Sequence, residues 1–401
     1  MTDFLDKIKH KINMMFFRLF LKLVKMPTAD TFIGTESSLQ LCRTIPMHGV
    51  SHILIVTDAV LSQLGLIKNC IEELERVGVR VTIYDGIAPN PTDEQVTEGI
   101  RIAKQSACDG VLGFGGGSPM DAAKVIAAGV NNDKTVAEME GFFRFKNPAL
   151  PLFLIPTTAG TGSETTFVAV VSSTQEERKY LLGDARFVPL AMAIDHTLMV
   201  GIPANITAET GMDALTHAIE SYISILASDR SRQASRIATK LIFNFLERAY
   251  KNGNDLEARE GMAYAAYQGG ASLIASAGYV HGIAHQLGGI YHITHGLANA
   301  VVLPHILEYS KVEASKPLSE LADVIGLDVA GKSEIEKAQL FIDAVKELSD
   351  SLNIPKHFEQ IKEQDVARIY TQAQTESLAA YGVPKLLPRA EGEAIIRKIM
   401  A

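Results

Sequence analysis

Hydrophobic and polar positions follow two different periodicities along the chain, and the change falls near residue 200. Before it, runs rich in β-branched and aromatic residues predict strands at 52–58, 79–85, 110–116 and 150–158. Helical spacing fills the stretches between them, at 60–77, 92–107 and 118–130. This strand–helix repetition predicts a parallel sheet covered on both faces, with ligands bound at the carboxyl ends of its strands.

Beyond Pro203 the spacing is helical, with almost no strand pattern, over 207–250, 256–278, 281–288, 296–315, 334–352 and 364–376. Gly201 and Pro203 mark a boundary between the two patterns. We therefore predict an α/β N-terminal domain with a parallel sheet, residues 27–202, and an all-helical C-terminal domain, residues 203–401. We expect the active site in the cleft between them.

Residues 1–26 predict a separate basic amphipathic helix. One sector of the helical wheel holds Lys7, Lys11, Arg18, Lys22 and Lys25. A wide opposite face holds Ile8, Ile12, Met15, Phe16, Leu19, Phe20 and Leu23. Charges interrupt every apolar run, which argues against a membrane span or a cleaved signal. Two interpretations stay open: peripheral contact with an anionic membrane, or packing on the protein itself or on a second subunit.

Composition narrows the class of protein. The 401 residues are 47% hydrophobic and 21% charged, with a formal net charge of −8, so there is no basic surface for a nucleic-acid partner. The odd number of cysteines, without CxxC spacing, favours reduced thiols and a cytoplasmic location. A soluble enzyme is expected, and a homodimer is the default oligomer.

A glycine run in FGGGSPMDAAK, residues 114–124, follows a predicted strand and begins a helix. Gly115, Gly116 and Gly117 would let backbone N–H groups approach a phosphate at the positive end of that helix. The alternative is a well-capped turn, with Ser118 and Asp121 as the capping pair and Pro119 as the first helical residue. The GxGxxG fingerprint is absent.

A second polar loop, PTTAGTGSET at 156–165, follows the next strand and holds five hydroxyl residues. Two such loops at successive strand ends indicate a ligand with two phosphates, which makes the first domain a dinucleotide-binding one. Asp58 ends the first strand and could bind an adenine ribose, which would favour NAD over NADP. A helix-capping role for Asp58 is the alternative.

Five of the eleven histidines lie between His281 and His305. His281 and His285 are one helical turn apart, as are Asp213 and His217, so each pair shares a helix face. Glycines at 288, 289 and 296 would let the chain fold back and bring His295 close. One carboxylate and three imidazoles suit Fe(II) or Zn(II), so Asp213, His217, His281 and His295 are the candidate ligands. His292 and His305 have no such spacing and are expected to be structural.

The segments GGGSPMDAAK, PTTAGTGSE, TGMDALTHAIE and HGIAHQLGGIYHITHGLANAVVLPH together resemble the iron-containing (group III) alcohol dehydrogenase family, over about residues 30–310. The resemblance implies that Asp213, His217, His281 and His295 are metal ligands and that His285 handles a proton. It also implies cofactor contacts at three groups of positions: Gly116, Gly117 and Ser118; Thr157, Thr158 and Thr161; and Asp58, Asn90 and Lys179. The segment 376–390 departs from the family's usual pocket sequence, which puts the substrate in doubt.

The resemblance implies a metal-dependent, NAD-linked alcohol dehydrogenase that oxidises a primary alcohol reversibly to an aldehyde. Fe(II) is the first choice of metal, with Zn(II) or another divalent ion as alternatives. The alternative function is a metal-dependent lyase on the same scaffold, similar to dehydroquinate synthase, which uses NAD without net redox change.

Overall fold

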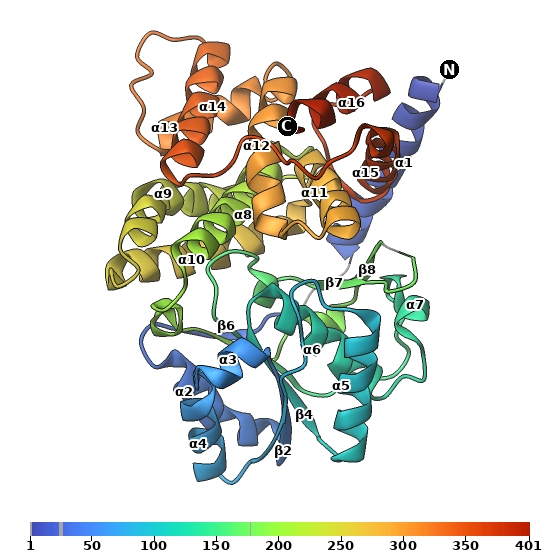
Figure 1. Ribbon diagram of the computed structural model, residues 1–401, viewed down its shortest axis with the longest axis vertical. Coiled ribbons are helices and arrows are strands. Elements are labelled where there is room, and N and C mark those ends of the chain that lie inside the picture. The colour runs from blue at the N-terminus through green and yellow to red at the C-terminus, as the bar shows by residue number, and fades with distance from the viewer. Residues whose placement is uncertain (1, 24–26, 177) are drawn as a thin grey trace. The chain divides into compact units, whose positions relative to one another are not determined.

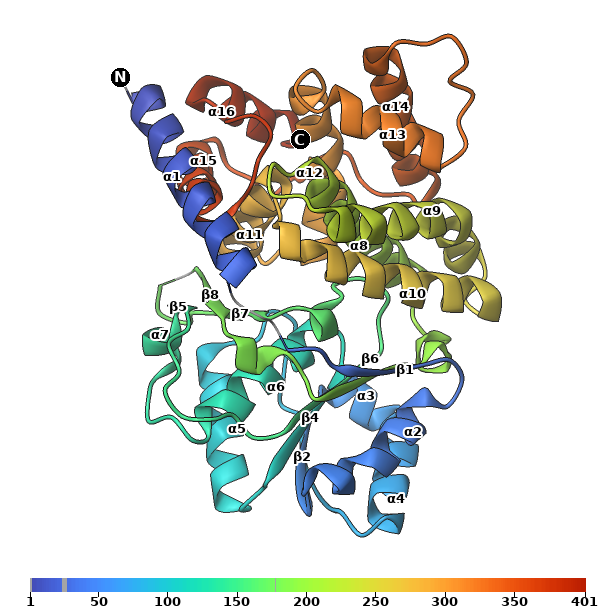
Figure 2. The same ribbon diagram turned by 180° about the vertical axis from the view of Figure 1, so that it is seen from behind.

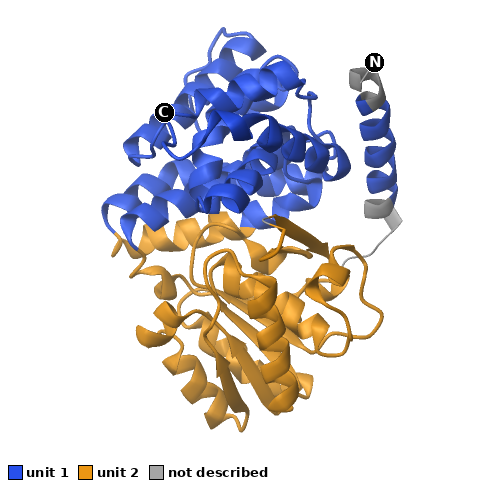
Figure 3. Cartoon of the chain, turned by 45° about the vertical axis from the view of Figure 1, so that its right-hand side comes forward, with its two compact units in different colours: residues 1–25, 203–252, 268–401 blue, residues 26–202, 253–267 orange. Residues whose placement is uncertain are grey.

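The computed structural model describes residues 2–23, 27–176 and 178–401, with the backbone alone for residues 2–5, 7 and 20–23. Its contacts divide the chain into two compact units, coloured separately in Figure 3. The sheet unit consists of Met26–Ile202 and Gly253–Tyr267. The helical unit consists of Met1–Lys25, Pro203–Asn252 and Gln268–Ala401. The cleft expected from the sequence stays a prediction.

A six-stranded sheet in the order β1-β9-β6-β4-β2-β3 forms the centre of the sheet unit, and all its pairings are parallel. Its strands are β1 (Asp30–Ile33), β2 (His52–Val56), β3 (Arg80–Tyr84), β4 (Gly110–Gly115), β6 (Leu152–Pro156) and β9 (Ala191–Ile194). The predicted parallel sheet and four of its strands are therefore confirmed. The sequence pattern missed β1 and β9, because each has only four residues and β9 reads Ala-Met-Ala-Ile.

Helices cover both faces of this sheet, as Figure 1 shows for β2 and β4. Ile53 and Ile55 of β2 lie in one apolar core with residues of the helices α2 and α4, whereas Leu54 and Val56 lie in another with α5 and α6. Alternate side chains of a strand point to opposite faces, so one strand contributes to both cores. The helices of this unit are α2 (Ser37–Thr44), α3 (Ala59–Gln63), α4 (Lys68–Arg76), α5 (Asp93–Gln105), α6 (Gly117–Gly129) and α7 (Val136–Met139).

Two features of this unit differ from the sequence prediction. The single helix expected at 60–77 is two helices, α3 and α4, separated by a turn in which Gly65 has a φ of +69°. A second sheet contains β5 (Gly141–Phe142), β7 (Val168–Ser172) and β8 (Lys179–Gly183), and β7 pairs antiparallel with β8. The antiparallel pairing of β7 with β8 thus interrupts the strand–helix repetition.

Helices build the other unit, as predicted; within its described residues the one β pairing is a single bridge between Phe358 and Met400. The helices are α1 (Thr2–Leu23), α8 (Ala204–Ile223), α9 (Asp229–Lys251), α11 (Tyr279–Tyr291), α12 (His295–Ser310), α13 (Ser315–Val324), α14 (Glu334–Ser351), α15 (Val366–Ala380) and α16 (Arg389–Lys398). A further helix, α10 (Leu256–Ser272), has residues in both units. The stretch 207–250, predicted to be helical, belongs to two helices, because Ser228 caps the start of α9 with a capping box.

The N-terminal segment forms the predicted helix, and α1 runs alongside α15 in both Figure 1 and Figure 2. Of the predicted positions, Lys25 lies outside the described residues, as do the side chains of Lys7, Phe20, Lys22 and Leu23. Among the described helices, we find none with the length and apolar character to cross a membrane.

Candidate active site

Three helices of the helical unit each contribute a pair of polar residues one turn apart to a single cluster. Asp213 and His217 come from α8, and His281 and His285 come from α11. The third pair, His295 and Asn299, comes from the first turns of α12. Residues four apart share a helix face, so three helices suffice to bring six polar side chains together.

Four of these side chains form a compact donor set. Asp213, His217, His281 and His295 each offer one ligand atom, and these atoms all lie within 4.8 Å of one another. The Asp213 Oδ1 atom is 3.6 Å from His217 Nε2 and 3.5 Å from His295 Nε2. Ligands at about 2.0–2.2 Å from one ion lie roughly 3–3.5 Å apart, so the two distances from Asp213 are close to the spacing of ligands on one divalent metal.

Glu220, on α8, orients His281. Its carboxylate lies 2.6 Å from His281 Nδ1 and accepts hydrogen bonds of 2.8 Å from the backbone N–H groups of Gly278 and Val280. It therefore neutralises the start of α11 and leaves His281 Nε2 for the cluster. Burial works against protonation of His281, but the bond to Glu220 and its charge outweigh burial, so the pKa of His281 is raised. A Cβ atom at position 278 would come within 2.5 Å of Glu220, which explains the glycine there.

Asn299 is completely buried beside the donor set. Its Nδ2 atom donates to Asp213 Oδ1 at 2.6 Å and lies 3.1 Å from His295 Nε2 and 3.3 Å from His281 Nε2. The amide thus fixes the orientation of the carboxylate relative to two imidazoles. Asn299 is not among the site residues predicted from the sequence, although its distance of four positions from His295 is a usable signal.

His285 lies next to the donor set and outside it. Its ring stacks on that of His295, with centroids 5.2 Å apart, and its Nδ1 atom lies 2.6 Å from Glu376 Oε1 on α15. The Tyr381 hydroxyl group donates a hydrogen bond to the same carboxylate. Burial would raise the pKa of Glu376, but the contacts with His285 and Tyr381 hold it below its ordinary value. Burial and the charge of Glu376 raise the pKa of Tyr381 well above its ordinary value, so Tyr381 remains a donor.

The chain reversal that brings His295 to the cluster differs from the one expected. Gly288 and Gly289 lie inside α11, and the turn is made at His292, whose φ is +56°. Gly296 has a different role, because a Cβ atom there would meet the Glu209 backbone oxygen at 2.4 Å. It allows the first turn of α12 to approach α8 closely. His292 is exposed, and His305 lies further along α12.

The two polar loops of the sheet unit lie against each other. A Cβ atom at Gly116 would come within 3.3 Å of Thr158, and one at Gly117 within 2.7 Å of Thr161. The next residue, Ser118, accepts a hydrogen bond from the Asn90 backbone N–H at 3.2 Å, and the Asn90 side chain accepts one from Lys179 at 3.0 Å. The structure therefore gathers most of the predicted cofactor positions around one helix start.

The capped-turn alternative for the glycine run is wrong. The helix α6 begins at Gly117, so Pro119 is its third residue, and Gly116 occupies the cap position without a side-chain bond. Asp121 accepts from Ser163 Oγ at 2.5 Å instead, and the Lys124 ammonium group donates to the Ser163 backbone oxygen at 2.7 Å. These bonds fix the threonine-containing loop to α6. The backbone N–H groups at the start of α6 have no side-chain cap from Gly116.

Asp58 follows β2 and Thr157 follows β6, so both residues lie at the carboxyl ends of parallel strands. Asp58 caps α3 by accepting from the Leu61 N–H at 2.9 Å, which is the alternative role expected for it. The Thr157 backbone N–H donates to the Gly115 carbonyl oxygen at 2.9 Å, extending the pairing of β4 with β6.

The three cysteines, Cys42, Cys70 and Cys108, are buried free thiols, as expected for packing residues.

Comparison with known proteins decides the family. The model "Iron-containing alcohol dehydrogenase" matches residues 27–196, and the model "Fe-containing alcohol dehydrogenase family, C-terminal" matches residues 207–400. The chain belongs to the iron-containing alcohol dehydrogenase family. Residues 1–26 precede the matched part.

Named relatives agree with this assignment. The chain is 36% identical over 356 residues to 1,3-propanediol dehydrogenase of Klebsiella pneumoniae, covering 88% of this chain and 91% of that one. It is 37% identical over 321 residues to NAD-dependent methanol dehydrogenase of Bacillus methanolicus, covering 79% and 84%. The crystal structure of a 1,3-propanediol oxidoreductase superimposes with a TM-score of 0.90 at 34% identity, covering 94% of this chain and all of that one.

The chain is thus a metal-dependent, NAD-linked alcohol dehydrogenase of the iron-containing type. The relatives are oxidoreductases, which favours this reaction over the lyase alternative. The donor set of one carboxylate and three imidazoles fits the divalent metal that the family name implies.

Proposed function

We propose that Asp213, His217, His281 and His295 bind one divalent metal ion, Fe(II) first and Zn(II) or another divalent ion second, and that the enzyme oxidises short primary alcohols reversibly to aldehydes. The observation that carries this proposal is the convergence of four ligand atoms within 4.8 Å from three helices. When bound at these residues, the ion would supply Lewis acidity at the alcohol oxygen, and the nicotinamide cofactor would supply the hydride acceptor.

We propose that His285 accepts the alcohol proton at Nε2, directly or through water. The Glu376 carboxylate holds the opposite ring nitrogen, Nδ1, at 2.6 Å, which favours a tautomer with Nε2 free to accept. Tyr381 and Gln286 donate to the same carboxylate and keep it in place, the latter at 3.1 Å. The residues of the chain thus orient the acceptor before the substrate binds.

For NAD we propose a site in residues 27–202, with residues 203–401 as the metal-binding domain; the two family matches divide the chain at a similar place. The diphosphate would bind at Gly116, Gly117 and Ser118, beside Thr157, Thr158 and Thr161. Asn90 and Lys179 support this placement, because the Asn90 backbone N–H donates to Ser118 Oγ and the Lys179 ammonium group donates to the Asn90 side chain. Asp58 would bind the adenine ribose.

The deciding experiment combines metal content with turnover. Protein reconstituted separately with Fe(II), Zn(II), Ni(II) or Mn(II) is assayed for NADH absorbance with a panel of primary alcohols, and in reverse with aldehydes. We expect NADH to accumulate, and Asp213→Ala and His281→Ala to lose both metal and turnover. Full turnover and full metal content in either variant would contradict the ligand assignment. Turnover of a substrate without formation of NADH would favour the lyase.

Cofactor choice has its own test. Asp58→Gly should raise kcat/KM with NADP relative to NAD, because it removes a charge that repels a 2′-phosphate. Asp58→Asn is the matched control, since asparagine keeps the helix cap without the charge. If neither variant changes the preference, Asp58 serves only as the cap of α3.

We further propose a cytoplasmic homodimer that makes peripheral membrane contact through residues 1–26. Reduced buried cysteines support the location. Analytical ultracentrifugation of the metal-loaded enzyme tests the dimer, and a monomer at micromolar concentration would contradict it.

A further inference from the structure

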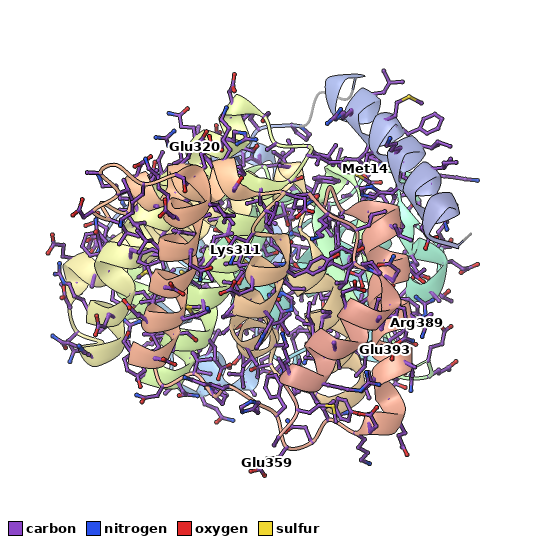
Figure 4. The ribbon with its side chains drawn as sticks, turned by 90° about the horizontal axis from the view of Figure 1, so that it is seen from above. Met14, Lys311, Glu320, Glu359, Arg389 and Glu393 are labelled. Carbon is purple, nitrogen blue, oxygen red and sulfur yellow. The ribbon has the colours of Figure 1, made fainter. Side chains whose placement is uncertain are left out.

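Helix α1 binds its own unit through a face that its sequence pattern does not predict. His10 Nε2 lies 2.9 Å from the Tyr381 backbone oxygen, and Asn13 Nδ2 donates to the Leu378 backbone oxygen at 2.9 Å. Met14 is 3% exposed, and Figure 4 places it on the side of α1 that faces the rest of the helical unit. Polar side chains paired with the backbone of the 378–381 segment therefore supply the anchor.

The opposite face of α1 carries an exposed apolar stripe. Its members and their exposed fractions are Ile8 41%, Ile12 46%, Met15 61%, Phe16 62% and Leu19 51%. At 100° per residue, these five positions lie within one sector, far round the helix from His10, Asn13 and Met14. A helix that needed only its own protein would bury its apolar face. Contiguous exposed apolar surface of this kind marks an interaction site.

Charge indicates what covers this stripe. Lys9 and Lys11 are exposed on either side of it, and the exposed Arg18 side chain reaches the Ile225 backbone oxygen. The first 26 residues contain six Lys or Arg against two Asp, although the whole chain has 46 acidic and 38 basic residues. The segment therefore opposes the net charge of the protein. A symmetric contact between two copies of α1 would bring like charges together, whereas an anionic surface would neutralise them.

We propose that α1 is a docking surface for an anionic phospholipid bilayer, with the stripe from Ile8 to Leu19 inserted at the boundary of headgroups and acyl chains. Lys9 and Lys11 lie beside the phosphates, and His10, Asn13 and Met14 keep the helix on the enzyme. This proposal rests on the peripheral contact in the proposed function and names its residues and its lipid. The stripe lies in residues 1–26, before the part of the chain that the family model matches.

The test is co-flotation of the full-length, metal-loaded enzyme with vesicles of phosphatidylcholine, with and without phosphatidylglycerol. We expect binding to the anionic vesicles and its loss in high salt. The triple variant Ile12→Ser, Phe16→Ser and Leu19→Ser should bind at least about tenfold more weakly. The double variant Lys9→Gln and Lys11→Gln should bind about tenfold more weakly at low salt. The matched control replaces three exposed apolar residues outside α1: Met47→Ser, Leu64→Ser and Val312→Ser.

Turnover and oligomeric state are measured on the same preparations without lipid. Unchanged NADH formation with lost flotation in the stripe variant supports the proposal and leaves the proposed reaction intact. Equal flotation of the stripe variant and its control overturns the lipid assignment, while continued turnover keeps the reaction. A stripe variant that changes from dimer to monomer would also overturn it, because the stripe would then cover a second copy.

Discussion

The two candidate sites, the glycine and threonine loops of the sheet unit and the histidine cluster of the helical unit, are built on opposite principles. At the loops, small residues let two backbone segments meet, and the surrounding side chains mainly hold those segments in place. In the cluster, the side chains are themselves the ligand atoms, and Glu220, Asn299 and Glu376 hold them. A phosphate needs close backbone N–H groups, whereas a metal needs fixed donor atoms. The two sites should therefore fail in different ways.

Removing a ligand should break the cluster completely. Asp213→Ala should lower kcat/KM by about a thousandfold or more, because Lewis acid stabilisation of several kcal/mol is lost. Inductively coupled plasma mass spectrometry should show loss of metal, while NADH binding measured by fluorescence persists. His292→Asn is the control, since asparagine tolerates the left-handed conformation and His292 is exposed. Normal turnover of Asp213→Ala would contradict the ligand set.

Weakening a support should damage the cluster partially. Glu220→Gln keeps the shape but loses the charge that orients His281 and neutralises the start of α11, so metal affinity should fall about ten- to a hundredfold. Competition with a chromophoric chelator measures this. Glu320→Gln on α13 is the matched control, because Glu320 accepts a hydrogen bond from Tyr222 away from the cluster. Equal affinities for the two variants would show that Glu220 is dispensable.

Adding one methyl group should damage the loops and spare the metal. Gly117→Ala would place a Cβ atom 2.7 Å from Thr161 Cγ2, so we expect the dissociation constant of NADH to rise about tenfold. Gly116→Ala should be milder, since its nearest contact is 3.3 Å. Adding Thr161→Ser to Gly117→Ala removes Cγ2 and keeps the hydroxyl, so binding should recover. No recovery would mean that the glycine serves backbone geometry instead of this contact.

A charged network in the helical unit away from the cluster should affect stability alone. Burial would raise the pKa of Glu308, but hydrogen bonds from Lys346, Gln339 and Lys311 lower it to about 2. The ionised Glu308 carboxylate therefore stabilises the fold at pH values above the ordinary pKa of glutamate. This contribution disappears as the pH falls towards 2. Glu308→Gln should lower Tm by about 1–2 °C at pH 7, and the difference should shrink below pH 4. A constant difference across that range, in thermal melts, would contradict the charge effect.

Local spacing explains what could be predicted of the two sites. Asp213 with His217 and His281 with His285 are visible as pairs because one helical turn separates them, and the two loops are visible because they follow strands. Glu220 and Glu376 are 61 and 91 positions from the histidines they hold, so local spacing carries no trace of them. The roles of Lys124 and Asp121 could not be predicted from local spacing either, because their hydrogen bonds to Ser163 depend on how the loop packs on α6.

For α1, the sequence by itself determined the helix, its basic segment and its apolar stripe, because these depend only on 100° of rotation per residue. Which face packs inward depends on partners elsewhere in the chain, and the tertiary structure assigned it to His10, Asn13 and Met14. The same division holds for the active site. Residue types and turn spacing specify which side chains can bind a metal, but only the packing of α8, α11, α12 and α15 decides which of them meet and what holds them there.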